Sequence, residues 1–305
     1  MKTRILVKEG EYKLTKAGVP DAKIDAEELF CFVAGTDKVG LFLRAEEEVD
    51  DETETEFNKL IDVRATRLPL QYIIGEQEFM GYKFKVEPGV LIPRQDTELL
   101  VGEAARAIQQ IQAEPKKRGL LRGLLFGGRS NINVLDLCCG SGAIGISLFK
   151  ICSDIRVFGT DISPEAIAVA EENAGILRAK VDFACGDMFE ALNVIKSQKK
   201  LPELDMIVSN PPYIKTNLIA MLQEEIKNYE PREALDGGRD GLDFYRIIVE
   251  QAADYLKDNG WLMLEIGYDQ GEVLRKMIKD SGRFTPAEVV KDLPGKDRVV
   301  KCRKA

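Results

Sequence analysis

Seven residues decide the fold: Ile207-Val208-Ser209-Asn210-Pro211-Pro212-Tyr213. The mostly apolar run from Leu204 to Val208 predicts a buried parallel strand, and the prolines that follow cannot donate to a strand ladder. We therefore expect the strand to leave the sheet at Asn210 in a stiff, extended turn. In open α/β folds, this carboxyl edge of the sheet is where ligands bind.

The turn holds rigid hydrogen-bond acceptors toward such a ligand. The side-chain carbonyl of Asn210 and a backbone carbonyl of Asn210 or Pro211 can accept both hydrogens of a planar NH2 group and aim its nitrogen at an electrophile. Tyr213 adds an aromatic face for stacking. The alternative is a proline-stiffened strand exit without chemistry, and the sequence before the turn decides between the two.

A glycine-rich turn follows an earlier predicted strand, in the sequence Val134-Leu135-Asp136-Leu137-Cys138-Cys139-Gly140-Ser141-Gly142-Ala143-Ile144-Gly145. Glycines at a strand-to-helix turn let backbone N–H groups approach a ligand, with a helix N-terminus behind them. Asp161 ends the next predicted strand, where it is placed to bind a ribose diol.

The spacing Gly140-x-Gly142-x-x-Gly145 also satisfies the dinucleotide fingerprint, so a nicotinamide-dependent dehydrogenase is a competing interpretation. Asp136 argues against it, because a carboxylate suits a cationic amino-acid moiety better than a pyrophosphate. A dehydrogenase also has no use for the Asn210 turn.

Around these motifs the sequence alternates between predicted strands and helices. The strands are expected at 133–138, 156–162, 181–185, 204–208 and 261–266. This alternation predicts a doubly wound, mostly parallel α/β sheet. The closing pair, 288–291 and 299–303, must include an antiparallel partner because its connection is too short for a crossover.

Residues 1–78 are predicted to be helical and are strongly acidic, with 11 Lys and Arg against 18 Asp and Glu. Most of the chain's net charge of −8 therefore lies in this part. The acid run from Glu46 to Glu56 is interpreted either as a solvated helical face or as a docking surface for a basic protein partner. Its sign disfavours nucleic acid.

Three further segments connect these parts. Residues 79–92 are expected to form a hairpin linker around Gly81. A helix is expected to begin near Glu98, with Asp96 or Thr97 as its N-cap, and to end near Ile111. The glycine-broken segment 114–131 is interpreted as a flexible surface insertion with a possible docking role.

Composition excludes several classes of function. The chain of 305 residues has no histidine, which removes Ser-His-Asp and Cys-His catalysis and histidine-containing metal sites, and no metal site is expected. Its six cysteines show no C-x-x-C spacing and are typical of a reduced, cytoplasmic protein. No run approaches membrane-spanning length and no signal peptide is recognised.

The pattern Asp136-x-x-x-Gly140-x-Gly142 with Asp161 and Asn210-Pro211-Pro212-Tyr213 is similar to that of S-adenosyl-L-methionine-dependent methyltransferases that act on a planar NH2 nitrogen. More narrowly, the chain resembles the HemK/PrmC family. That family methylates the glutamine side-chain nitrogen in the Gly-Gly-Gln motif of class I peptide chain release factors. The likeness runs from about Leu68 to the end and includes further motifs at 70–75, 91–98, 229–231, 234–241 and 264–270.

The resemblance implies a role for each matching residue. Cofactor binding is expected of Asp136, Cys138, Cys139, Gly140, Ser141, Gly142, Asp161, Met188 and Asn210. Substrate binding is expected of Asn210, Pro211, Pro212 and Tyr213, with Asn210, Pro211 and Tyr213 as the catalytic set. The departure is Cys138-Cys139, where the family usually has Gly-Thr; a Cβ there is unwelcome if the backbone needs a positive φ.

The resemblance also implies an organisation and a partner. Residues 1–78 would dock the substrate, and residues 93–305 would form a Rossmann-like methyltransferase domain. The expected protein is a cytoplasmic monomer that acts on release factors, without DNA or a membrane. Two alternatives stay open: another NH2-directed methyltransferase, acting on ribosomal protein, adenine or guanine, and a non-catalytic adaptor that keeps the cofactor domain as a scaffold.

Overall fold

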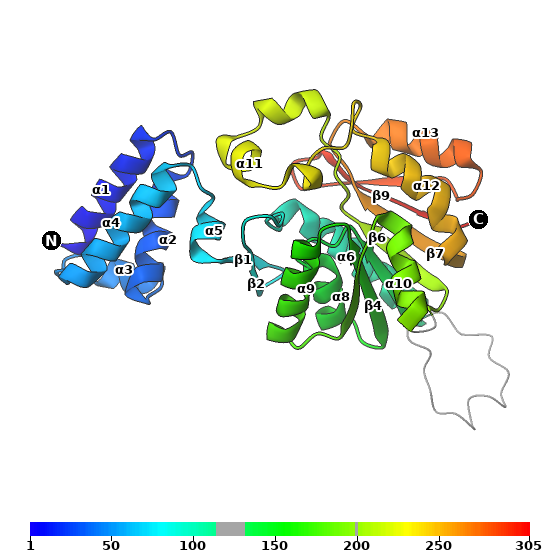
Figure 1. Cartoon of the computed structure of the whole chain (residues 1–305), viewed down its shortest axis with the longest axis horizontal. Coiled ribbons are helices and arrows are strands. Elements are labelled where there is room, and N and C mark those ends of the chain that lie inside the picture. The colour runs from blue at the N-terminus through cyan, green and yellow to red at the C-terminus, as the bar shows by residue number, and fades with distance from the viewer. Residues whose placement is uncertain (114–131, 199–200) are drawn as a thin grey trace, which may run out of the picture. The chain divides into compact units, whose positions relative to one another are not determined.

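The computed structural model describes residues 1–113, 132–198 and 201–305. The predicted insertion at 114–131 lies outside these ranges. The chain forms two compact units (Figure 1). The first consists of Met1–Glu76, Val86–Pro88 and Met221–Glu230, and the second of Gln77–Lys85, Gly89–Ala220 and Pro231–Ala305.

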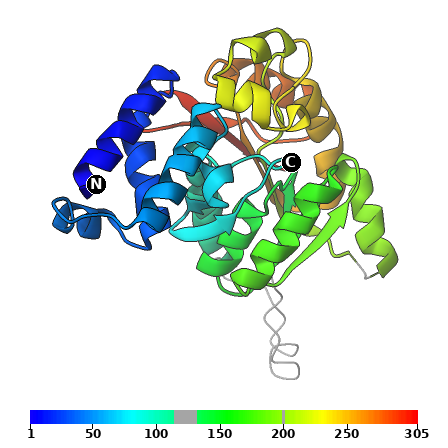
Figure 2. The same ribbon diagram turned by 60° about the vertical axis from the view of Figure 1, so that its left-hand side comes forward.

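The first unit is helical, as predicted. Its helices are α1 (Thr3–Lys16), α2 (Ala22–Ala34), α3 (Lys38–Leu43), α4 (Asp51–Ala65), α5 (Leu70–Ile74) and α11 (Glu224–Tyr229). Helices α1, α2 and α4 pack side by side (Figure 2). Their core includes the fully buried Leu6, Leu29 and Phe57, and the ring of Phe57 meets that of Phe30 edge-on at 5.8 Å between centroids.

Part of the acid run serves the local structure of this unit. The Asp50 side chain caps α4 by accepting from the backbone N–H of Thr53 at 2.8 Å, and Asp51, Glu52 and Glu54 follow in the first turn. Acids at that end of a helix are favourable because they face the positive end of its dipole. Glu46 forms exposed ion pairs with Lys2 and Arg4.

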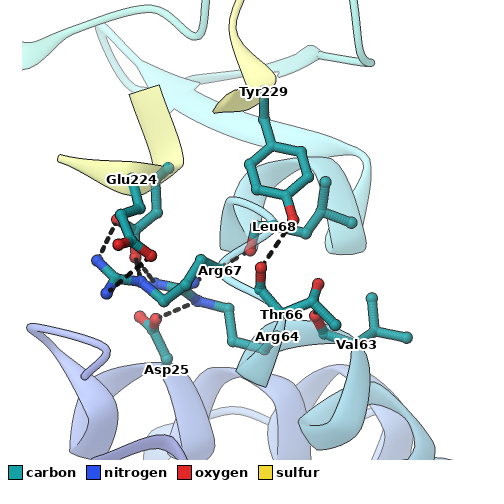
Figure 3. A network of polar contacts seen from close by, with 9 residues as sticks. Asp25, Val63, Arg64, Thr66, Arg67, Leu68, Glu224 and Tyr229 are labelled. Atoms are coloured by element: carbon teal, nitrogen blue, oxygen red, sulfur yellow. Dashed lines mark hydrogen bonds and ion pairs between the residues drawn. The ribbon is translucent and has the colours of Figure 1, made fainter. Parts of the chain in front are cut away.

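A buried ionic network joins α11 to the rest of the helical unit (Figure 3). Arg64 donates to Asp25 at 2.7 Å and to Glu225 at 3.0 Å, and Arg67 donates to Glu225 at 2.7 and 2.5 Å. Burial raises the pKa of Glu225, but the hydrogen bonds from both arginines outweigh it and lower that pKa to about 2. Glu225 therefore stays ionised at every physiological pH. Because the network reaches from α2 to α11, it fixes a segment that is remote in sequence.

The second unit contains a seven-stranded sheet in the order β5-β4-β3-β6-β7-β9-β8. The strands are β3 (Ile132–Leu137), β4 (Ile155–Asp161), β5 (Val181–Cys185), β6 (Leu204–Ser209), β7 (Leu256–Glu265), β8 (Glu288–Lys291) and β9 (Asp297–Arg303). Neighbouring strands from β5 to β7 pair in parallel, while β9 is antiparallel to both β7 and β8. The predicted doubly wound sheet and antiparallel closing pair are confirmed.

Helices cover both faces of the sheet (Figure 1). The alternating side chains of β3 divide between two cores: Leu135 and Leu137 pack with α10 (Ala191–Gln198), α12 (Asp243–Tyr255) and α13 (Gly271–Ser281). Ile132 and Val134 pack on the other side with α6 (Glu98–Ala113) and α8 (Ala143–Ile151), and α9 (Pro164–Ile176) borders that core. A period of two in a strand buried on both faces produces this division.

The predicted hairpin is present as β1 (Glu76–Phe79) and β2 (Tyr82–Lys85). The predicted N-cap of the following helix is wrong. A 3-10 turn, η1 (Gln95–Thr97), precedes α6 and has Arg94 at its own cap position. The side chains of Asp96 and Thr97 make tertiary contacts instead. None of the helices in the described ranges combines the length and the apolar character needed to cross a membrane.

Candidate active site

Four polar residues meet at the carboxyl edge of the sheet because their strands are neighbours. Strand β3 lies between β4 and β6, with Asp136 opposite Val208, and β6 pairs with β7 so that Ser209 lies opposite Leu264. The next residue along β6 is Asn210, where the chain leaves the sheet, and the next along β7 is Glu265, its last residue, which pairs with Val299 of β9. Asp161 ends β4 on the other side of β3. This is the edge at which the sequence predicts a ligand site.

The glycine loop between β3 and α8 is a tight turn. Gly142 occupies the N-cap position of α8 with a φ of 78°, and its N–H donates to the carbonyl of Cys139 at 2.8 Å. A Cβ at Gly142 would lie 2.9 Å from the side chain of Ile146 and 3.1 Å from that of Ala170. Glycine is therefore required there both by conformation and by space. The carbonyl of the buried Ser141 accepts from the Asn173 side chain at 3.0 Å, which fixes the loop to α9.

Cys138 does adopt a positive φ, of 59°, so the replacement of glycine by cysteine carries a backbone strain of about 1 kcal/mol. Its sulfur lies 3.8 Å from that of Met188, which begins the turn η2 (Met188–Glu190) and has a φ of 42°. The structure thus brings together two residues predicted for the cofactor site. Burial raises the pKa of the Cys138 and Cys139 thiols, which keeps both protonated.

Asp136 is fully buried beneath the loop. One carboxylate oxygen accepts from the Gly145 N–H at 2.8 Å, and the other has no hydrogen-bond partner among the residues the structure describes. Burial raises the pKa of Asp136 to about 7, with a further rise from the nearby Asp161. An uncompensated carboxylate at this position is costly unless a cation reaches it.

Asp161 joins the loop to the exit of β4. Its two carboxylate oxygens accept from the N–H of Gly140 at 2.8 Å and from the N–H of Ser163 at 3.0 Å. Ser163 in turn caps α9 by accepting from Ala166. Burial raises the pKa of Asp161 against these hydrogen bonds. A carboxylate has more acceptor sites than these backbone N–H groups occupy, so Asp161 can still accept from a hydroxyl.

The Asn210 turn leaves the sheet as predicted, with Pro211 and Pro212 buried and Asn210 partly exposed. The Asn210 amide nitrogen donates to the hydroxyl of Thr97 at 3.3 Å. Since the amide nitrogen and oxygen diverge from the same planar carbon, the side-chain oxygen does not face Thr97. In the described ranges, no backbone N–H donates to the carbonyl oxygen of Pro211.

Two later motifs support the backbone of this turn. The buried Gln270 donates to the Tyr213 carbonyl at 3.0 Å and accepts from the N–H of Gly267 at 2.8 Å. A Cβ at Gly237 would lie only 2.7 Å from the Tyr213 Cα, so the 234–241 segment packs directly against the turn. These contacts hold the turn more rigidly than its prolines could alone.

Glu265 and Thr97 are residues of this site that the sequence did not predict to lie there. Glu265 is 1 % exposed; one carboxylate oxygen accepts from the Tyr213 hydroxyl at 3.2 Å, and the other has no hydrogen-bond partner among the residues the structure describes. Burial raises the pKa of Glu265 to about 7, against the lowering effect of the nearby hydroxyl groups and of Arg298. The available signal was a carboxylate directly after the apolar strand segment that ends at Leu264.

This fold and site define a methyltransferase, and the methyltransferase domain family matches residues 129–301. The PrmC N-terminal domain family matches residues 6–75. Over 287 residues the chain is 42% identical to the release factor glutamine methyltransferase of Geobacter sulfurreducens, covering 94% of this chain and 91% of that protein. The chain belongs to the release factor glutamine methyltransferase family, which confirms the resemblance seen in the sequence.

Other relatives agree. The release factor glutamine methyltransferase of Thermodesulfovibrio yellowstonii is 41% identical, with 92% of each chain covered. That of Clostridium botulinum is 35% identical, with 98% of each covered. Among solved structures, the delta-N METTL16 MTase domain superposes with a TM-score of 0.50 at 14% identity, covering 81% of this chain and 96% of that one, which supports the fold alone.

Proposed function

We propose that this protein transfers a methyl group from S-adenosyl-L-methionine to the side-chain amide nitrogen of the glutamine in the Gly-Gly-Gln motif of class I release factors. Family membership carries the reaction and the substrate. The observation that carries the site is the Asn210 amide, whose nitrogen is bonded to Thr97 so that its oxygen is left for a substrate NH2 group.

The residues at the sheet edge fit the cofactor. The unpartnered oxygen of Asp136 suits the cofactor's ammonium group, and the Asp161 carboxylate suits its ribose hydroxyls. Cys138 and Met188 offer sulfur and methylene surface to the adenine ring, and the backbone from Cys139 to Gly142 lines the approach. When bound, the cofactor supplies an electrophilic methyl group on a sulfonium sulfur.

The protein's task is to orient a poor nucleophile. An amide nitrogen has its lone pair in resonance with the carbonyl, so two acceptors that grip its hydrogens favour pyramidalisation and raise electron density at nitrogen. The Asn210 side-chain oxygen and the Pro211 carbonyl are these acceptors, and the Tyr213 ring stacks on the amide plane. In-line placement makes up to about 7–11 kcal/mol available from orientation. The product then loses a proton to water, so the lack of histidine has no cost.

The helical unit is the docking element for the release factor in this proposal. Its acid run is only partly engaged in caps and ion pairs, and the exposed remainder can steer a basic partner. Reversing Glu47 and Glu48 to lysine should lower the on-rate and flatten its dependence on salt, with cofactor affinity unchanged. An unchanged salt dependence would reduce the acid run to a solvated surface.

The test of the reaction is methyl transfer from radiolabelled S-adenosyl-L-methionine to four purified substrates in parallel. These are release factor, ribosomal protein, DNA and rRNA, with a release factor whose Gly-Gly-Gln glutamine is replaced by alanine as the control. Label should enter only the intact release factor. Label in nucleic acid or ribosomal protein instead would support another NH2-directed enzyme, and no transfer to any substrate would support an adaptor.

A further inference from the structure

The Asn210 turn is followed by a segment, residues 214–238, that leaves the second unit and returns to it. Met221–Glu230, in the middle of the segment, belongs to the helical unit, and the residues on both sides belong to the second unit. The chain therefore passes from the second unit to the first and back within this one segment. We call Met221–Glu230 the tip, and residues 214–216 with 235–238 the stem.

The stem consists of two short stretches joined by backbone hydrogen bonds. The Ile214 N–H donates to the Leu235 carbonyl at 2.9 Å, and the Ile214 carbonyl accepts from the Gly237 N–H at 2.8 Å. Ile214 directly follows Tyr213 in the sequence, and a Cβ at Gly237 would lie only 2.7 Å from the Tyr213 Cα. The position of the stem therefore fixes the backbone of Tyr213, at the end of the proposed substrate turn.

The tip is held in the helical unit mainly by polar contacts. Its helix, α11, has six residues and is too short to be stable by itself. Of these six residues, all of which the structure describes, Glu225 alone is buried, at 8 % exposure. The apolar core of the helical unit is built from residues between Leu6 and Ile74, outside the tip. The contacts of Glu225 therefore decide whether the tip stays in place.

Glu225 is the centre of a clamp that joins the tip to α4 and the turn after it (Figure 3). Its carboxylate accepts from Arg64 at 3.0 Å and, at two points, from Arg67 at 2.7 and 2.5 Å. A two-point bond of this kind fixes the orientation of the carboxylate. The Tyr229 hydroxyl adds a bond to the Thr66 carbonyl at 2.7 Å. Arg67 has a φ of 73°, which a residue other than glycine keeps only where its surroundings impose it.

We propose that Glu225 is a positioning residue for methyl transfer, which keeps the stem closed and Tyr213 in place by fixing the tip within the helical unit. The inference rests on the proposed function and deepens it, because the helical unit then affects the rate of the chemical step as well as docking. With the tip released, the stem alone has to hold the ends of a long loop together against the entropy of that loop. Opening of the stem moves the Pro211 carbonyl and the Tyr213 ring out of the geometry that the reaction needs.

Hydrogen exchange in the substrate-free protein tests the clamp directly. Glu225→Gln keeps the shape of the side chain and removes the charge that binds both arginines. It should speed the exchange of the stem amides of Ile214, Thr216 and Gly237 by about tenfold or more, and leave the amides of β3 unchanged. These stem amides lie in the second unit, so loss of stability confined to the helical unit would not affect them. Unchanged exchange in the stem would overturn the proposal.

Two control variants separate the clamp from the general stability of the helical unit. Glu224→Gln is the matched control, because the Glu224 side chain is 51 % exposed and lies 3.7 Å from Arg67. Asp25→Asn removes the other carboxylate that accepts from Arg64, at 2.7 Å, and does not alter the tip. Both variants should leave exchange in the stem near that of the parent. Acceleration by Asp25→Asn equal to that by Glu225→Gln would assign the effect to a loosened helical unit and overturn the proposal.

Tyr229→Phe keeps the test decisive if Glu225→Gln does not fold. It removes only the hydroxyl bond to the Thr66 carbonyl, from a partly exposed side chain. Exchange of the stem amides should rise in this variant too, by a smaller factor than in Glu225→Gln. With Glu225→Gln unfolded, exchange in Tyr229→Phe equal to that of the parent would overturn the proposal.

Single-turnover methyl transfer at saturating release factor and cofactor tests the consequence for the reaction. Glu225→Gln should slow the chemical step by about 10- to 100-fold with the affinity for S-adenosylhomocysteine unchanged, whereas Glu224→Gln and Asp25→Asn should stay within about threefold of the parent. A variant that needs more release factor for saturation but then reacts at the parent rate would have lost docking alone, which would overturn the positioning role. If the parent does not methylate release factor at all, the proposed function fails, while hydrogen exchange still decides whether the clamp controls the stem.

Discussion

Replacing Asp136 by asparagine should stabilise the cofactor-free protein at high pH while removing its affinity for the cofactor. The carboxylate is fully buried, has one oxygen without a partner among the described residues, and has a pKa raised from 3.8 to about 7 by burial. Asparagine keeps an acceptor for the Gly145 N–H and carries no charge to bury. The substitution thus removes the free-energy cost of burying the charge while keeping the shape of the side chain.

The magnitude follows from the two pKa values. Between pH 3.8 and pH 7 the folded state binds the Asp136 proton and the unfolded state does not, so stability falls as pH rises through this window. The slope is about 1.4 kcal/mol per pH unit, which makes the charge about 2–3 kcal/mol more costly at pH 8 than at pH 5. An unpaired amide N–H in the variant costs about 1–3 kcal/mol at every pH. The pH dependence of the difference is therefore the diagnostic quantity, not its absolute size.

Denaturant unfolding of the full chain at pH 5, 6, 7 and 8 measures the difference in unfolding free energy between the parent and Asp136→Asn. Trp261 is the only tryptophan and lies on β7, so its fluorescence reports on the second unit without interference from the helical one. The unfolding free energy of Asp136→Asn, relative to that of the parent, should increase by about 2–3 kcal/mol from pH 5 to pH 8. S-adenosylhomocysteine should stabilise the parent at pH 8 and leave the variant unaffected. A difference that is constant with pH would refute the reasoning that Asp136 is a buried charge awaiting a cation.

Asn210→Ala should slow single-turnover methyl transfer by about 100- to 1000-fold at saturating cofactor, because one of the two acceptors for the substrate NH2 group is lost. A rate within a few-fold of the parent would mean that the turn has only a structural role. Tyr213→Phe should reduce kcat by less than about tenfold, since the hydroxyl is used inward on Glu265 and the stacking ring remains; a larger loss would mean that the hydroxyl contacts the substrate. Arg64→Met should destabilise the helical unit by about 3–5 kcal/mol, measured by hydrogen exchange of α2 and α4. It leaves the buried Asp25 carboxylate without its arginine partner and takes one of two arginine partners from Glu225. Arg4→Met, in an exposed ion pair, is its control and should change stability by less than about 1 kcal/mol.

The features that the sequence predicted are those with local causes. The exit of β6 was recognisable because prolines end a ladder wherever they occur, and the glycine loop because its φ values exclude most side chains. The period of two along β3 and the helical spacing in residues 1–78 likewise follow from neighbours in the chain. Cys138 shows the limit of this reasoning: its positive φ was foreseen as a difficulty, and the fold imposes it regardless.

The features that were missed depend on contacts between residues far apart in sequence. Thr97 resembled an N-cap in its local sequence, yet its hydroxyl accepts from the side-chain amide of Asn210, 113 residues away. The segment Met221–Glu230 lies within the α/β part of the sequence but belongs to the helical unit, held by Arg64 and Arg67 through Glu225. Arginine is expected to be exposed unless it is paired with a carboxylate, and residue propensities do not identify that carboxylate. Buried polar residues that join distant segments are thus the least predictable part of this protein, and they are also what orients its proposed catalytic amide.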